Sequence, residues 1–174
     1  MFGKALVAAV FAAAMSVSVS FAGDQFVDKT GYAASGYDVV SYFDLAQSPV
    51  GQSQPAPLAG SKSLTTEYNG ATFAFASKAN LDRFLANPDG YAPQYDGHCA
   101  YGVAKGNKVP GNPTLWRIVK GKLYLNITKS VVRFWEQDIP GNLKKSKSKW
   151  KSLDARPASH DRVPSFKSAA PVVN

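Results

Sequence analysis

The chain's single cysteine, Cys99, directly follows His98 in a segment rich in tyrosine and glycine, residues 91–103. The other histidine, His160, lies near the C-terminus. Thiolate and imidazole are ligands that copper and zinc favour, and both bind metal in their deprotonated form. Asp96 can add a carboxylate oxygen. The sequence therefore predicts a metal site at Asp96, His98 and Cys99, with copper or zinc as the ion.

The arrangement of these residues leaves other interpretations open. Adjacent side chains diverge in a strand or helix, so a single ligand with a supporting partner, or a homodimer that supplies two Cys99 and two His98, is easier to build than chelation by one pair. A buried structural thiol beside a hydrogen-bonded histidine is the main alternative. A catalytic thiol would use His98 as base and Asp96 to orient it, but no nucleophile motif accompanies them. We expect no enzymatic activity.

Residues 1–22 have the pattern of a secretory signal peptide. Lys4 precedes an apolar run from Ala5 to Met15, and small residues stand before a predicted cleavage after Ala22. The run is shorter than the roughly 20 residues that a membrane-spanning helix requires. We therefore expect a periplasmic or secreted protein. A lone cysteine in an oxidising compartment has no partner for an internal disulfide.

The formal net charge of +8 is concentrated towards the C-terminus. The segment Lys144 to Lys151 reads KKSKSKWK, which can bind an anionic membrane surface with Trp150 as an anchor at the interface. A solvated helix face is the alternative. Nucleic acid is not an expected partner after export. Beyond Leu153, three prolines and little periodicity predict a disordered basic tail, residues 154–174.

Hairpin and capping signals predict the elements around the candidate site. Asn69-Gly70 lies between two strand-like runs, which is a strong mark of a β-hairpin. Ser77 is a good cap for a helix from Lys78 to Ala86, which Asn87-Pro88 ends. The result is a hairpin followed at once by a helix.

A second hairpin is predicted over residues 116–125, with its turn at Lys120-Gly121. Thr128 can cap a helix to about Gln137, and a last helix is expected over residues 142–153. Residues 31–45 fit a short helix or a strand, and residues 47–60 an exposed loop. The two hairpins differ in sequence, so no internal repeat is apparent. We predict a small single α+β domain, residues 23–153, with two β-hairpins and several helices.

The run from Tyr68 to Tyr91 resembles a YHS domain. The residues at the motif positions are Tyr68, Gly70, Phe73, Phe75, Ser77, Phe84, Pro88 and Tyr91. The wider layout of residues 31–150 is similar to a subgroup of exported bacterial YHS proteins. This resemblance implies a core of hairpin and helix. It also implies an association with metals, because typical YHS domains occur beside copper pumps and are thought to bind metal through cysteines.

The chain departs from the YHS pattern at the ligands. Ala76 and Asn80 replace the two motif cysteines, and Tyr37 to Tyr42 replaces the usual N-terminal cysteine segment. Alanine has no donor atom, and the hard carbonyl oxygen of asparagine does not suit copper(I). Metal binding would therefore have moved to His98 and Cys99. We expect a non-catalytic exported module that binds or senses metal, with copper favoured. The alternative is a structural or partner-binding protein with a buried cysteine and a basic helix that docks on a membrane or protein.

Overall fold

The computed structural model describes residues 25–156, so the predicted signal peptide and most of the predicted tail lie outside the described residues. The first predicted hairpin is confirmed. Strands β1 (Ser61–Tyr68) and β2 (Ala71–Phe75) pair antiparallel. Asn69 and Gly70 form the turn with φ values of 47° and 74°, the left-handed region that these two residue types tolerate.

Two capped helices follow this hairpin. The Ser77 side chain accepts a hydrogen bond from the backbone N–H of Asn80 and so caps α1 (Lys78–Ala86), which has the predicted bounds. The Asn87 side chain then accepts from the N–H of Gly90 and caps α2 (Pro88–Tyr91). Local side-chain hydrogen bonds therefore define where both helices begin.

The second predicted hairpin is also confirmed, as β3 (Asn112–Val119) and β4 (Lys122–Asn126). Thr128 accepts from the N–H of Val131 and caps α4 (Lys129–Glu136). Helix α5 (Ile139–Leu153) starts at Ile139 rather than at the predicted Asn142, because the Asp138 side chain caps it by accepting from the N–H of Gly141.

These two halves are structural repeats, which corrects the expectation of no internal repeat. Both hairpins contain an irregularity at the same place in their register. The matching pairs are Ser61–Phe75 and Thr65–Ala74 in the first hairpin, and Asn112–Asn126 and Trp116–Leu125 in the second. Each hairpin leads into a helix capped by a hydroxyl residue and then one capped by Asn or Asp. From the start of these strands to Gly90 and Gly141, each residue of the second repeat lies the same number of positions after its equivalent in the first repeat.

A left-handed turn precedes each repeat. In η1 (Ala34–Gly36) and at Tyr95 to Gly97 in η3 (Gln94–Gly97), each residue has a positive φ, between 48° and 81°. The chain then makes the same backbone hydrogen bonds in both repeats. Asp38 N–H donates to Leu58 and Gly60 N–H to Gly36 in the first, and Cys99 N–H to Val109 and Gly111 N–H to Gly97 in the second. Asp38 and Cys99 therefore occupy equivalent positions.

The close approach of these segments explains two of the glycines. A Cβ atom on Gly60 would lie 2.6 Å from the backbone carbon of Ala74, and one on Gly111 would lie 2.5 Å from the carbonyl oxygen of Gly97. Both distances are too short for a side chain. Residues 31–45, which fitted either a short helix or a strand, form η1 and η2 (Ser41–Asp44) and are mostly buried.

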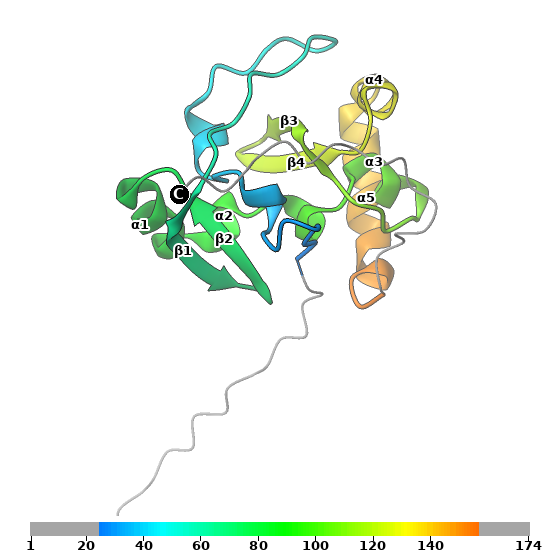
Figure 1. The fold of residues 1–174 in the computed structure, drawn as a ribbon. Helices are drawn as coiled ribbons and strands as arrows, with labels where there is room; N and C mark the ends of the chain where they lie inside the picture. Colours follow the sequence, from blue (N-terminus) through cyan, green and yellow to red (C-terminus); the bar gives the residue numbers. More distant parts are fainter. Residues whose placement is uncertain (1–24, 157–174) are drawn as a thin grey trace, which may run out of the picture.

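One core joins the two repeats. β1, β2, α1 and α2 lie on one side of it, and β3, β4, α4, α5 and α3 (Ala100–Lys105) lie on the other (Figure 1). The Tyr42 hydroxyl donates to the Pro113 carbonyl at 3.0 Å, and its ring meets Trp116 edge to face at 5.3 Å. The predicted small single α+β domain with two hairpins is confirmed. Within residues 25–156, the helices are too short or too polar to cross a membrane.

Candidate functional site

Cys99 is fully buried and caps helix α3. Its Sγ accepts a hydrogen bond from the N–H of Gly102 at 3.3 Å and donates to Asn126 Oδ1 at 3.5 Å. Burial raises the pKa of the Cys99 thiol, and the nearby backbone N–H groups, of which Gly102 is the strongest, oppose this only in part. The thiol is therefore protonated near neutral pH and shielded from solvent, which makes it a poor nucleophile and a poor metal ligand in this state.

His98 lies inside an aromatic cluster. Its Nδ1 is 2.8 Å from the Tyr95 carbonyl oxygen, which can only accept, so Nδ1 carries a proton. The imidazole ring packs against Phe26 at 5.7 Å and Trp150 at 6.1 Å between ring centroids. With 1% of its surface exposed, His98 is as inaccessible to a metal ion in solution as Cys99.

Asp96 belongs to a different set of contacts. Its Oδ1 accepts from Gln25 Nε2 at 3.2 Å and from Asn69 Nδ2 at 3.1 Å, which ties the N-terminal segment to the turn of the first hairpin. Among the residues that the structure describes, no three His, Cys, Asp or Glu side chains are grouped to hold a metal ion. The three predicted ligands are therefore not brought together. Metal binding by Asp96, His98 and Cys99 stays a prediction. It would require these side chains to exchange hydrogen-bond partners for the metal ion.

Sequence reasoning missed Asp38, the fully buried residue equivalent to Cys99. Its Oδ1 accepts from the N–H groups of Val40 and Ser41 at 2.9 and 3.3 Å. Its Oδ2 accepts from Ala76 N–H at 2.9 Å and Asn80 Nδ2 at 2.6 Å. Ala76 and Asn80 are the positions where YHS domains carry cysteines, so a hydrogen-bonded carboxylate now joins them. The available signal was an acidic residue beside the apolar pair Val39-Val40.

Trp150 belongs to the aromatic cluster around His98. Its indole packs on Tyr95 with 5.4 Å between ring centroids, and Lys108 Nζ lies 5.2 Å from the indole centroid. The ring also packs against His98, and the role of Trp150 as an interfacial anchor stays a prediction. The lysines of α5 do face solvent. They are Lys144, Lys145, Lys147, Lys149 and Lys151.

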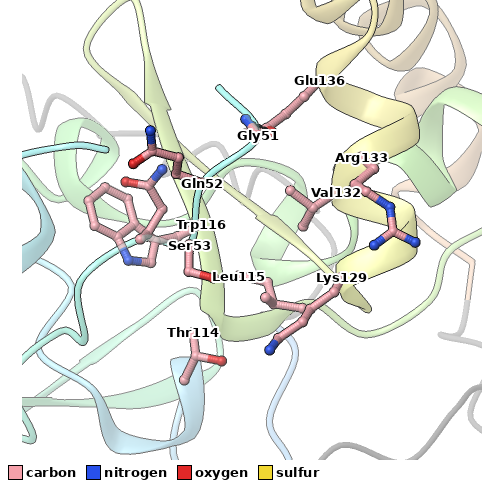
Figure 2. Close-up of a pocket in the computed structure, with 11 residues that line it drawn as sticks. Gly51, Gln52, Ser53, Thr114, Leu115, Trp116, Lys129, Val132, Arg133 and Glu136 are labelled. Carbon is pink, nitrogen blue, oxygen red and sulfur yellow. Dashed lines mark hydrogen bonds between the residues drawn. The ribbon is translucent and has the colours of Figure 1, made fainter. Parts of the chain in front are cut away.

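A surface pocket of about 340 Å³ lies where the segment of residues 47–60 meets β3 and α4 (Figure 2). As predicted, this segment has no helix or strand and is largely exposed. The residues that line the pocket are Gly51, Gln52, Ser53, Gln54, Thr114, Leu115, Trp116, Lys129, Val132, Arg133 and Glu136. The pocket shares no residue with the predicted metal site, and the sequence alone gave no indication of it.

Comparison with known proteins identifies a YHS domain at residues 53–95 of the 174 in the chain. This range spans β1, β2, α1 and α2, so it corresponds to the first repeat, and the second repeat lies outside it. The resemblance seen in the motif residues is thereby confirmed for that part of the chain. No curated protein and no solved structure matches the chain.

Proposed function

We propose that the chain is an exported, non-catalytic binding module in which Cys99 stabilises the fold. The observation that supports this best is the equivalence of Cys99 and Asp38. Each side chain accepts a hydrogen bond from the backbone N–H three residues further along the chain, at 3.3 Å in both repeats. A carboxylate stands at this position in one repeat and a thiol in the other, so what the two side chains share is the backbone N–H group from which they accept. Providing an acceptor for such an N–H group is a requirement of the fold.

A metal-associated module is the second candidate, and the YHS match favours it. Copper or zinc would then be held by Cys99 as a thiolate and by Nε2 of His98, with Asp96 as an oxygen donor. Reaching that state requires the thiol to lose its proton and, with it, the hydrogen bond that it donates to Asn126 Oδ1. The structural role requires neither change, and for this reason we rank it first.

The exposed lysines of α5 are the proposed docking surface for an anionic partner such as a lipid bilayer. With the Trp150 ring packed on Tyr95, binding would depend chiefly on electrostatics and would weaken steeply with salt. Co-sedimentation with anionic vesicles at low and high ionic strength tests this part. Binding that persists at high salt, or that survives replacement of Lys144, Lys145 and Lys147 by glutamine, would count against it.

Metal titration separates the two candidates. Residues 23–174 would be purified reduced and titrated with copper(I) and zinc in competition with a chromophoric chelator. Cys99→Ser and His98→Gln would serve as site variants, and His160→Gln as the control for the histidine near the C-terminus. We expect no affinity tighter than micromolar at His98 and Cys99. Tight stoichiometric binding that both site variants abolish and the control retains would establish the metal-binding candidate instead.

A further inference from the structure

The two repeats differ most in the segment before the hairpin. In the second repeat, α3 ends at Lys105 and β3 begins at Asn112, whereas in the first repeat η2 ends at Asp44 and β1 begins only at Ser61. The additional residues form a loop that projects beyond the rest of the fold on the side of β3 (Figure 1). A long loop on a compact domain commonly carries a binding function.

This loop is fastened to the second repeat by a buried ion pair. Arg117 Nη2 and Glu136 Oε1 lie 2.5 Å apart, and their side chains are only 6% and 4% exposed. Both side chains also bond to the loop backbone. Arg117 donates to the carbonyls of Ser48 and Pro49 at 3.2 and 3.3 Å, and Glu136 accepts from Gly51 N–H at 2.8 Å. A buried ion pair is tolerated when its remaining polar groups are satisfied, and the loop satisfies these.

The ion pair exists only where the loop docks. The equivalent positions in the first repeat are Thr66 and Leu85, which cannot form such a pair. Trp116 Nε1 adds a bond to the Pro55 carbonyl at 2.9 Å, and Gln54 bonds with Ser48 within the loop. The loop is therefore held in place before any ligand arrives, which lowers the entropic cost of binding.

The pocket beneath the loop combines an apolar wall with unpaired cations. Leu115, Trp116 and Val132 supply apolar surface. Lys129, Val132 and Arg133 line the pocket from α4. Lys129 and Val132 point toward the loop, whereas the Arg133 guanidinium lies on the side of the helix away from Ser53 (Figure 2). Neither cation has a carboxylate partner among the ion pairs of residues 25–156, and Glu136, the acid in the pocket lining, is paired with Arg117. The pocket therefore has a positive rim.

We propose that this pocket binds a small organic anion with a planar apolar body, such as an aromatic carboxylate or phosphate. The volume of about 340 Å³ lies at the lower end of the range of ligand pockets, about 300–1,000 Å³. Lys129 would bind the anionic group, joined by Arg133 when its exposed side chain turns toward the ligand, and the wall of Leu115 and Val132 would cover the ring. This inference names the ligand class of the proposed binding module and rests on that proposal.

Amide chemical shifts of residues 23–174 would test the site with defined probes. Benzoate and phenyl phosphate would be titrated beside neutral benzamide. We expect shifts confined to residues 51–54, 114–116 and 129–136, and binding of at least one of the anions at least about tenfold tighter than benzamide, since charge-assisted hydrogen bonds are roughly twice as strong as neutral ones. Shifts elsewhere, no shifts, or equal binding of benzamide and the anions would overturn the proposal.

A matched pair of double variants isolates the rim from net charge. Lys129→Gln with Arg133→Gln should weaken anion binding at least about tenfold, while Lys29→Gln with Lys62→Gln, two exposed lysines outside the pocket, removes the same charge and should change it less than about twofold. Equal losses of anion affinity in the two double variants would show that net charge alone causes the effect, and would refute the site. Failure of anion binding with Cys99 still shielded would reject the pocket while leaving the structural role of Cys99 intact, so the two failures are distinguishable.

Discussion

Asp38 and Cys99 occupy the same position in two repeats of one structural unit. Each side chain accepts a hydrogen bond at 3.3 Å, Asp38 from Ser41 N–H and Cys99 from Gly102 N–H. In each case the residue also bonds to the segment that leads into the hairpin, through its backbone N–H to the carbonyl of Leu58 or Val109. This shared role accounts for a single buried cysteine without calling on metal chemistry.

Cys99 variants should be ranked by their ability to accept a hydrogen bond. Cys99→Ala removes the acceptor for Gly102 N–H and should lower the free energy of unfolding by about 1–2 kcal/mol, as loss of a helix cap does. Cys99→Ser keeps an acceptor and should cost less than Cys99→Ala. Equilibrium urea denaturation measures both. A serine variant less stable than the alanine variant would show that packing of the sulfur, and not the cap, sets the stability.

Asp38 should be the more demanding of the two equivalent residues, because its carboxylate accepts from four N–H groups. Asp38→Ala leaves these donors buried without acceptors and should cost at least about 3 kcal/mol of unfolding free energy. Asp38→Asn should lower the unfolding free energy by an intermediate amount, because the NH2 group of asparagine would face some of these N–H donors and cannot accept from them. The control is Asp82→Asn in an exposed pair with Lys78, which should change stability by less than about 1 kcal/mol. Similar losses at both positions would contradict the assignment.

The Arg117–Glu136 ion pair should contribute more to holding the loop of residues 47–60 in place than to the stability of the domain. Either Arg117→Met or Glu136→Met alone leaves one buried charge unpaired and should cost about 3–5 kcal/mol, whereas the double variant should recover most of that loss. The loop, however, should become sensitive to protease in the double variant because its backbone bonds are gone. Thermal unfolding and limited proteolysis of residues 47–60 test the two effects separately. A double variant whose loop stays resistant would show that other contacts fasten it.

Stability should fall in alkaline solution. Desolvation raises the pKa of Tyr68 from 10.0 to about 12, helped by its hydrogen bond to Asp89, and burial raises that of Tyr124 from 10.0 to about 12. A pKa raised by folding stabilises the native state fully below the unfolded value, and this stabilisation is lost as pH rises through the folded value. Unfolding free energy should therefore decline between about pH 10 and about pH 12.

Tyr124→Phe provides the internal control for this pH effect. The variant lacks the ionisable hydroxyl, so its stability should decline less steeply over the same pH interval. The near-ultraviolet absorbance of tyrosinate, recorded alongside denaturation, gives the ionised fraction directly. Parallel pH profiles for the variant and the natural chain would assign the alkaline loss to other groups.

The sequence predicted the elements that local chemistry defines. Asn69-Gly70 marks a turn because of its φ preferences, and Ser77 and Thr128 mark helix starts because their hydroxyl groups cap the backbone. The repeat was not predictable in this way. Equivalent residues perform one role with different chemistry, as Phe84 and Trp135 do in filling the core. Identity between the repeats survives mainly at glycines that backbone geometry requires.

The candidate site was less predictable than the fold. The residue types of His98 and Cys99 suggest a metal site, but whether such residues bind metal depends on which groups surround them. Asp38, Trp150 and the Arg117–Glu136 pair owe their roles to contacts between residues far apart in the chain. Such contacts have no periodic or local sequence pattern. Left-handed η1 is a further case, since Ala34 and Ser35 have no preference for a positive φ.

The labelling rate of the single thiol tests the central claim most directly. Because Cys99 is the only cysteine, a thiol reagent reports on it without interference. We predict that native protein reacts orders of magnitude more slowly than protein in denaturant, in proportion to the small unfolded fraction, and that added copper(I) or zinc leaves the native rate unchanged. Native labelling nearly as fast as that of the unfolded chain, or labelling that stoichiometric metal blocks, would contradict a structural role for Cys99.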